Sequence, residues 1–300
     1  KRFIRKVKND EKPFFIYLCT NAPHGPMHSP EKFSAPYTKQ GVNVGNFFGM
    51  IANIDHNVGQ MRAFLKKEGL AENTIFIFTT DNGTGGGVRG TIGGVRPSGG
   101  KASNYEGGVC EPFIVNCPGL VPGGRETDAL TDFSDLLPTF AELGGAKLPK
   151  GVTLDGRSFA SLLLGQADDS PRDWIMALGH GAGRLDKKGV RGTNDFADRV
   201  LRDKRHKVWL EHEPKITALY DLKSDPLEQK NLLNSDKPEH LAALKKFRAI
   251  IGSQPKVDGR PLYRPRKANS WDKQFQANLE KPTSNKPKRE RRRKRKAAQQ

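Results

Sequence analysis

Two short apolar runs on either side of a long amphipathic segment constrain the fold of this chain more than any other feature. The first run spans 13–19 and the second spans 74–80. Continuous apolar runs of this length are typical of strands buried on both faces of a parallel sheet. Between them, from 46 to 69, apolar residues recur at steps of three and four, which predicts an amphipathic helix capped by Gly69. We therefore expect strand, helix and strand, joined by a right-handed parallel crossover.

The patterns after residue 80 extend this section and then change character. The expected elements are a third strand over 112–115, helices over 134–143 and 157–164, short strands over 174–178, 206–211 and 217–222, and a helix over 236–251. We predict an α/β fold with a mostly parallel sheet flanked by helices over 1–165. A small antiparallel sheet with a helix is expected over 166–255, followed by a basic disordered tail over 256–300.

The charge of the chain is concentrated at its end. The net charge is +18 over 300 residues, and residues 281–300 hold ten Lys or Arg against one Glu, which is half of that excess. Such a tail can contact polyanions, namely nucleic acid, an anionic membrane or a polyanionic substrate. The alternative is a solvated extension, which the absence of interleaved aromatic residues favours.

Membrane and disulfide signals are weak. No stretch of about 18 apolar residues occurs, so no transmembrane segment is expected. Residues 1–20 lack the pattern of a signal peptide, so the start of the chain does not indicate a location. Cys19, Cys110 and Cys117 are too few for a disulfide framework, although one bridge would be compatible with them.

Candidate ligands follow the second apolar run. Asp81 and Asn82 offer a carboxylate and an amide oxygen, a combination suited to Ca²⁺ or Mg²⁺. Lys101 lies in a segment, 81–111, that contains eleven glycines, where an anion can approach both an ammonium group and backbone N–H groups. Open parallel sheets bind ligands at this edge. The alternatives are an ordinary Asp-Asn-Gly turn and a solvated lysine.

His24 follows the first apolar run, and so we expect it at the same sheet edge as Asp81. Its imidazole could donate a hydrogen bond to an anion or protonate a leaving group. The alternative is a turn histidine bonded to backbone. No comparable sequence setting surrounds His28, His56, His180, His206 or His212. Glu106 could equally be a salt-bridge partner within its loop.

A series of motifs runs in order between about residue 10 and residue 250. They are Pro13-Phe14-Phe15-Ile16-Tyr17-Leu18, Ala22-Pro23-His24-Gly25-Pro26, Asp55 to Gly59, Asn73 to Gly83, Gly99 to Gly108, Pro112-Phe113-Ile114-Val115, Asp135-Leu136-Leu137-Pro138-Thr139, Leu219-Tyr220-Asp221-Leu222, Asp225-Pro226 and Asn231-Leu232. In this order they resemble the sulfatase family of the alkaline phosphatase superfamily. The resemblance implies the C-terminal part of an alkaline-phosphatase-like sandwich.

The resemblance also implies roles for the candidate residues. Asp81 and Asn82 would ligate a divalent ion, normally Ca²⁺, while Lys101 and His24 would bind the sulfate group and stabilise charge on its oxygens. The implied activity is hydrolysis of sulfate esters, with sulfated carbohydrates among the candidate substrates. A periplasmic or secreted location is favoured by the same resemblance.

The nucleophile of the family is absent from this sequence. Relatives use a formylglycine made from Cys or Ser within CxPxR or SxPxR, and neither motif occurs; the nearest match, at Cys110, has Ile114 in place of the arginine. We therefore expect a chain that carries only part of the active site and does not turn over alone. Two alternatives are a phosphate or phosphonate ester hydrolase of the same superfamily and a non-catalytic protein that binds polyanions through its basic tail.

Overall fold

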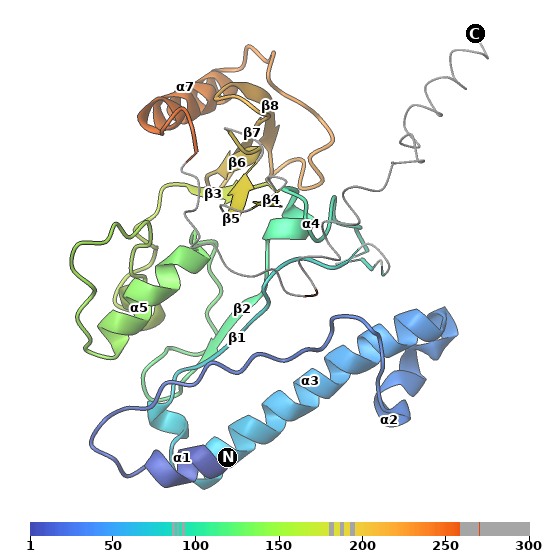
Figure 1. Ribbon diagram of the computed structural model, residues 1–300, viewed down its shortest axis with the longest axis vertical. Coiled ribbons are helices and arrows are strands. Elements are labelled where there is room, and N and C mark those ends of the chain that lie inside the picture. Colours follow the sequence, from blue (N-terminus) through green and yellow to red (C-terminus); the bar gives the residue numbers. More distant parts are fainter. Residues whose placement is uncertain are drawn as a thin grey trace.

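The computed structural model describes residues 1–85, 88, 90–91, 94–179, 183–186, 189–192, 196–258 and 270 (Figure 1). Its helices are α1 (Arg2–Val7), α2 (Glu31–Ser34), α3 (Val42–Lys67), α4 (Glu106–Val109), α5 (Leu136–Leu143), α6 (Ala160–Leu163) and α7 (Pro238–Ser253). Its strands are β1 (Phe76–Thr79), β2 (Phe113–Asn116), β3 (Ile175–Leu178), β4 (Gly183–Asp186), β5 (Gly189–Gly192), β6 (Arg199–Arg202), β7 (His206–Leu210) and β8 (Ile216–Asp221). Nearly all of the predicted basic tail lies outside the described residues. Among the described helices, none combines the length and apolarity that crossing a membrane requires.

The long amphipathic helix is confirmed as α3. It ends at Lys67, and Gly69 follows with φ +74°, a conformation that favours glycine. Phe64 and Leu65, near its C-terminal end, are buried against Ile4 of α1, and Phe14 and Phe76 pack on the same cluster. The helix therefore holds the ends of both apolar runs together through a small core.

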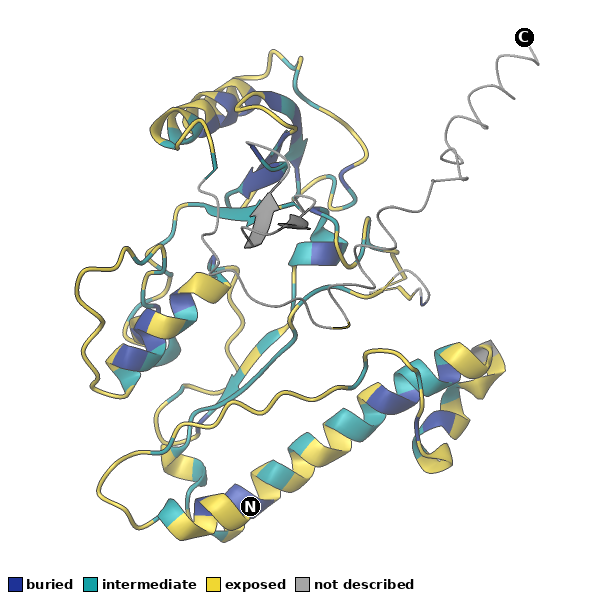
Figure 2. Cartoon of the chain, in the orientation of Figure 1, coloured by how far each residue is buried: buried dark blue, intermediate teal, exposed yellow. Residues whose placement is uncertain are grey.

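The first apolar run does not form the strand that its composition predicts. Residues 13–20 have no strand partner within the described chain, and Phe15, Tyr17 and Leu18 are 68%, 83% and 72% exposed. Figure 2 shows this segment largely in the exposed colour. An apolar run becomes a buried strand only where a neighbouring strand completes its hydrogen bonds and other elements cover its faces.

The predicted parallel crossover is likewise wrong for the described residues. The second run forms β1, which pairs with β2 in antiparallel register, from Phe76 opposite Asn116 to Thr79 opposite Phe113. All strand pairs of the described residues are antiparallel. The apolar composition of these strands identified them as strands but carried no information about direction.

The predicted antiparallel sheet with a helix is confirmed. Its strands are ordered β3-β6-β7-β8, and α7 covers one face (Figure 1). Val208, Leu219 and Phe247 are completely buried in the core between this sheet and α7. Strand β6 and the β4–β5 hairpin were not expected, because β6 begins and ends with arginine and the hairpin has no alternating apolar pattern.

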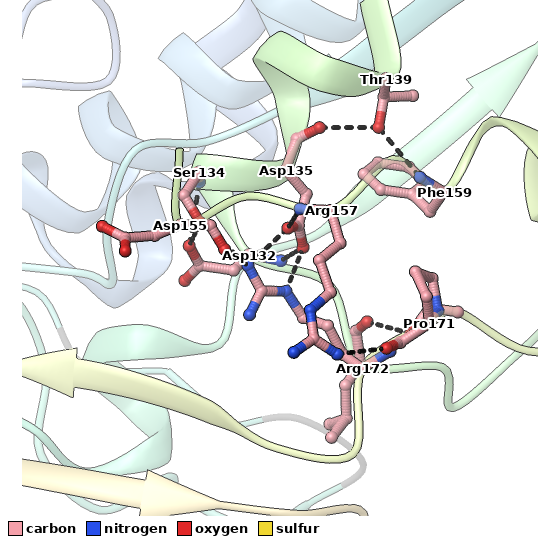
Figure 3. A network of polar contacts seen from close by, with 11 residues as sticks. Asp132, Ser134, Asp135, Thr139, Asp155, Arg157, Phe159, Pro171 and Arg172 are labelled. Atoms are coloured by element: carbon pink, nitrogen blue, oxygen red, sulfur yellow. Dashed lines mark hydrogen bonds and ion pairs between the residues drawn. The ribbon is translucent and has the colours of Figure 1, made fainter. Parts of the chain in front are cut away.

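A polar network joins α5 to the chain on either side of α6 (Figure 3). Asp135, which is buried, accepts hydrogen bonds from Arg172 Nε at 2.6 Å and from the backbone nitrogen of Arg157 at 2.7 Å. Thr139 Oγ1 donates to the carbonyl of Asp135 at 2.7 Å and accepts from the nitrogen of Phe159 at 3.1 Å. The Asp-Leu-Leu-Pro-Thr motif therefore organises loops around a helix start, and its carboxylate is engaged with a guanidinium group.

Candidate active site

The turn that carries Asp81 and Asn82 lies against the glycine-rich loop that carries Lys101. The backbone nitrogen of Gly83 donates to the carbonyl of Gly108 at 3.2 Å, and the nitrogen of Lys101 donates to the carbonyl of Thr84 at 2.9 Å. A Cβ atom at Gly83 would lie 2.8 Å from Gly108 Cα, a distance that real Cβ contacts do not show. Glycine at this position therefore permits the close approach of the two segments.

The loop around Lys101 is held in a shape that favours glycine. Gly99 and Gly100 have φ values of +80° and +153°, and Ser103 Oγ donates to the carbonyl of Gly100 at 2.8 Å. A Cβ atom at Gly100 would lie 2.8 Å from the carbonyl oxygen of Thr84. The backbone is thus fixed by local bonds while the side chain of Lys101 is exposed. This arrangement presents an ammonium group from a defined position.

Buried charges of the C-terminal sheet hold α4, the helix that follows Lys101 and its glycine-rich loop. Lys207 of β7 is completely buried, and its Nζ lies 3.0 Å from both Glu106 Oε1 and Glu228 Oε1. Glu228 also accepts from the backbone nitrogen of Glu106 at 2.9 Å and from Trp209 Nε1 at 2.9 Å. Arg202 Nη1 donates to Glu106 Oε2, so Glu106 is a salt-bridge partner, but its partners belong to β6 and β7 rather than to its own loop. We call these contacts of Glu106 and Glu228 with Lys207 and Arg202 the brace. The brace fixes α4, which directly follows the lysine loop, the glycine-rich segment around Lys101.

Glu111 is a candidate that the sequence patterns did not reveal. Its Oε1 atom is buried and has no hydrogen-bond partner among the described residues. Burial, followed by the charges of Asp81 and Glu106, raises the pKa of this carboxyl to about 7. Glu111 therefore lies within electrostatic reach of the predicted metal ligand Asp81. It belongs to no periodic pattern, so only its position in the fold identifies it.

His24 makes a local contact in this structure. Its Nδ1 atom lies 2.8 Å from the carbonyl oxygen of Gly25, and its side chain is exposed. Among the described residues, the contact of His24 is therefore with its own turn rather than with Asp81 or Lys101. The preceding run does approach the site, since interaction with Cys19, and to a lesser extent the charge of Asp81, raises the pKa of Tyr17.

The residues brought together suit a hard cation beside a tetrahedral anion. Asp81 and Asn82 supply oxygen atoms, and the charge of Asp81 acts on the carboxyl of Glu111, whose buried Oε1 has no hydrogen-bond partner among the described residues. These oxygen donors fit Ca²⁺ or Mg²⁺, and the buried Oε1 atom of Glu111, which lacks a partner among the described residues, supports that fit. Lys101 adds a positive charge on the adjoining loop, which suits an anion bound next to such an ion.

Two family models match the chain. The Sulfatase model matches residues 1–146, and the model described as N-sulphoglucosamine sulphohydrolase, C-terminal, matches residues 100–250. The second match covers half of the chain, and the two together cover its first 250 residues. The chain belongs to the sulfatase family.

Individual relatives agree with this assignment. Arylsulfatase A of Homo sapiens is 33% identical over 264 residues, which cover 81% of this chain and 50% of that protein. The crystal structure of Ps i-CgsB in complex with k-i-k-neocarrahexaose is 25% identical, with a TM-score of 0.66 over 92% of this chain and 57% of that chain. The PsFucS1 sulfatase from Pseudoalteromonas sp. is 23% identical, with a TM-score of 0.61 over 86% of this chain and 52% of that chain.

These likenesses confirm the predicted fold class, an α/β chain corresponding to the C-terminal part of a sulfatase. The chain spans about half the length of the curated relatives that it matches. The loop that carries Lys101, the Asp-Asn-Gly turn, the antiparallel sheet and all but the last three residues of α7 fall within the residues matched by the two family models.

Proposed function

We propose that this chain supplies the metal-binding and anion-binding part of the active site of a sulfuric ester hydrolase. The observation that carries the proposal is the pair of backbone hydrogen bonds that joins the Asp81–Asn82 turn to the Lys101 loop, at 3.2 Å and 2.9 Å. Membership of the sulfatase family supports it. The rival phosphate or phosphonate ester hydrolase would use the same cation and anion geometry, and no observation favours it.

In this proposal Asp81 and Asn82 hold a divalent cation, with Ca²⁺ the first candidate and Mg²⁺ the second. The bound cation would offset negative charge on the sulfate oxygens. Lys101 donates to the same sulfate group and stabilises the charge that develops on its oxygens. His24 donates to the sulfate group or gives a proton to the leaving alcohol, which requires its imidazole to leave the local contact with Gly25.

The nucleophile is proposed to come from sequence outside this chain. The printed sequence contains neither CxPxR nor SxPxR, the patterns in which the family's formylglycine is made. The chain alone is therefore expected to bind the cation and a sulfate group but to hydrolyse no ester.

Substrate class and location are part of the same proposal. Sulfate esters are the proposed substrates, and the oligosaccharide in the Ps i-CgsB complex supports a sulfated carbohydrate among them. A periplasmic or secreted location follows the family resemblance. We also propose that residues 1–165 and 166–255 act as two units, and that the basic tail over 256–300 contacts polyanionic substrate.

The proposal is tested with the gene product that carries this chain together with its upstream sulfatase sequence. Hydrolysis of p-nitrophenyl sulfate is measured for the unsubstituted protein and for Lys101→Ala, with Lys66→Ala, an exposed lysine of α3, as the matched control. Loss of one donor to the developing charge is expected to lower kcat about 100-fold. The Lys66→Ala variant should retain full activity.

Two outcomes would contradict this assignment. Equal activity of Lys101→Ala and the unsubstituted protein would remove Lys101 from the site. A rate with p-nitrophenyl phosphate that exceeds the rate with p-nitrophenyl sulfate would favour the phosphate ester hydrolase. Asp81→Asn, measured across a Ca²⁺ titration, separates metal binding from anion binding, because it should raise the Ca²⁺ concentration needed for half-maximal activity.

A further inference from the structure

Three buried side chains of the C-terminal sheet and its helix bring metal-ligating atoms together, apart from the proposed active site. His206 is the first residue of β7, Asp221 is the last residue of β8, and His240 lies in the first turn of α7. One candidate donor atom from each lies within 4.8 Å of the other two. The three residues are only 7%, 3% and 5% exposed, so the cluster is enclosed by protein.

Regular structure places these side chains together. His206 and Asp221 stand directly opposite each other in the antiparallel register of β7 and β8, so their side chains leave the same face of the sheet. Val208 and Leu210, at the following alternate positions of β7, pack in the core with α7, which shows that this face is the one α7 covers. His240 approaches from that helix, and its ring centroid lies 6.0 Å from that of His206.

One ring nitrogen of His206 has no partner among the described residues. His206 Nε2 is buried and makes no hydrogen bond within the described part of the chain. Buried polar atoms are nearly always paired with protein, with ordered water or with an ion. The side chain that carries this atom is more than nine-tenths buried and is directed into the cluster. A bound ligand at this position would therefore supply the missing partner of His206 Nε2.

The other two side chains are already held by neighbours of the kind that surround metal ligands. His240 Nδ1 lies 2.7 Å from Ser235 Oγ, and if this nitrogen donates, the lone pair of Nε2 faces away from the serine. Asp221 accepts from the backbone nitrogen of Lys223 at 3.1 Å and from Arg205 Nη2 at 2.8 Å. Such outer contacts orient imidazole and carboxylate ligands.

We propose that His206, Asp221 and His240 form a binding site for a divalent transition cation, with Zn²⁺ the favoured ion. Two imidazoles and one carboxylate are ligands that Zn²⁺ accepts, at about 2.0–2.2 Å from the ion. The donor atoms would need to draw together from separations of up to 4.8 Å, which side-chain rotation can accommodate. The ion would cross-link β7, β8 and α7, so its role is structural.

The local charges permit this binding. Arg205 is positive, but its side chain is 46% exposed and can turn toward solvent while Asp221 retains its backbone contact with Lys223. Asp203 lies next to the cluster, since its Oδ1 accepts from the backbone nitrogen of His206 at 2.7 Å, and its Oδ2 is paired with Lys246 Nζ at 2.8 Å. A cation at this site would therefore face two carboxylates, each of which is paired with a partly exposed basic side chain, and Arg205 is the one that has to turn away.

The test uses the whole 300-residue chain, purified without a histidine tag and stripped of metal by a chelator. Zn²⁺ is titrated in competition with a chromogenic chelator, and Co²⁺ is titrated while its visible absorption is recorded. We expect one equivalent of either ion, with a water molecule as the fourth ligand, the Co²⁺ spectrum of a tetrahedral site and a higher Tm for the loaded chain. His206→Gln and His240→Gln should each weaken Zn²⁺ binding at least about tenfold.

Two control variants separate this site from other binding. His212→Gln removes a histidine whose side chain is 71% exposed and should leave Zn²⁺ affinity unchanged. Asp81→Asn should also leave it unchanged, because that residue belongs to the proposed active site rather than to this cluster. The inference fails if either cluster variant binds Zn²⁺ as tightly as the unsubstituted chain.

A second measurement does not depend on the folding of any variant. X-ray absorption of the Zn²⁺-loaded, unsubstituted chain should show two imidazole ligands and no sulfur in the coordination shell. A shell with a sulfur ligand would place the ion at a cysteine. A shell with one imidazole or none, or a chain that takes up no Zn²⁺, would likewise overturn the inference.

Discussion

The C-terminal sheet with α7 and the apolar run over 13–20 show opposite fates for similar side chains. In the sheet, Val208 and Leu219 are completely buried, whereas Tyr17 and Leu18 of the run are largely exposed. Strand β7 has a hydrogen-bonded partner on each side, β6 and β8, while the run has no strand partner among the described residues. Burial of apolar side chains is favourable, but it occurs only where neighbouring strands and helices pack against them.

The largest effect is expected from a cavity in the core between the C-terminal sheet and α7. Phe247→Ala in α7 should lower the free energy of unfolding by about 3–5 kcal/mol, because Phe247 is completely buried in the core of the sheet. Urea unfolding followed by circular dichroism measures this loss. Leu241→Ala on the exposed side of the same helix is the control and should change the value by less than about 0.5 kcal/mol. Equal losses in both variants would show that α7 is not packed as described.

A second substitution tests the buried ion pairs of Lys207. Lys207→Met removes the cation that lies between Glu106 and Glu228 and should cost about 3 kcal/mol, because it leaves buried carboxylates without their partner. Urea unfolding followed by circular dichroism would measure the change. Lys204→Met, whose ion pairs are exposed, should cost less than about 1 kcal/mol. A cost below that of Lys204→Met would contradict the role of the brace.

The pH dependence of stability tests the burial of Glu111, which lies between α4 and β2. Because burial raises the pKa of this carboxyl from 4.5 to about 7, the folded chain binds a proton that the unfolded chain releases. Stability should therefore fall as the pH rises from about 4.5 to 7, and Glu111→Gln should abolish this fall. At about pH 8 we expect the variant to be more stable by about 1–2 kcal/mol, discounted for partial exposure, and equal at about pH 4.

Thermal unfolding across this pH range, with a chelator present, provides the measurement. Added Ca²⁺ should reduce the difference between Glu111→Gln and the unsubstituted chain, since a cation at Asp81 favours the ionised carboxylate nearby. A variant whose stability follows the same pH profile as the unsubstituted chain would show that Glu111 is not buried in solution.

The smallest effect is expected in the exposed apolar run over 13–20. Replacing Tyr17 and Leu18 together by serine should change the free energy of unfolding by less than about 0.5 kcal/mol, because both side chains are exposed. The same double variant should bind less of a dye that fluoresces on apolar surfaces. Leu219→Ser, in the closed core, is the matched comparison and should cost several times more. A loss above about 2 kcal/mol in the double variant would show that the run is packed in solution.

Much of the candidate site could be predicted from local sequence. The Asp-Asn-Gly turn at the end of β1 and the glycine-rich loop around Lys101 are short segments whose shapes follow from the conformations that glycine allows. The helix α3 and the strands β7 and β8 were equally readable, because their apolar spacing is regular. The roles of Asp81, Asn82, Lys101 and His24 remain proposals that the experiments above test.

Sequence by itself determined α3, α7, β1, β2, β7 and β8 and the family resemblance, because each depends on neighbours along the chain. Only the tertiary structure decided which distant side chains meet. Lys207 is 101 residues from Glu106 and 21 from Glu228, and His206 meets Asp221 only through strand pairing. Contacts of this kind arise when a folded sheet brings its two faces against different partners. For β7 these partners are α7 on one face, and Glu106 of α4 together with Glu228 on the other.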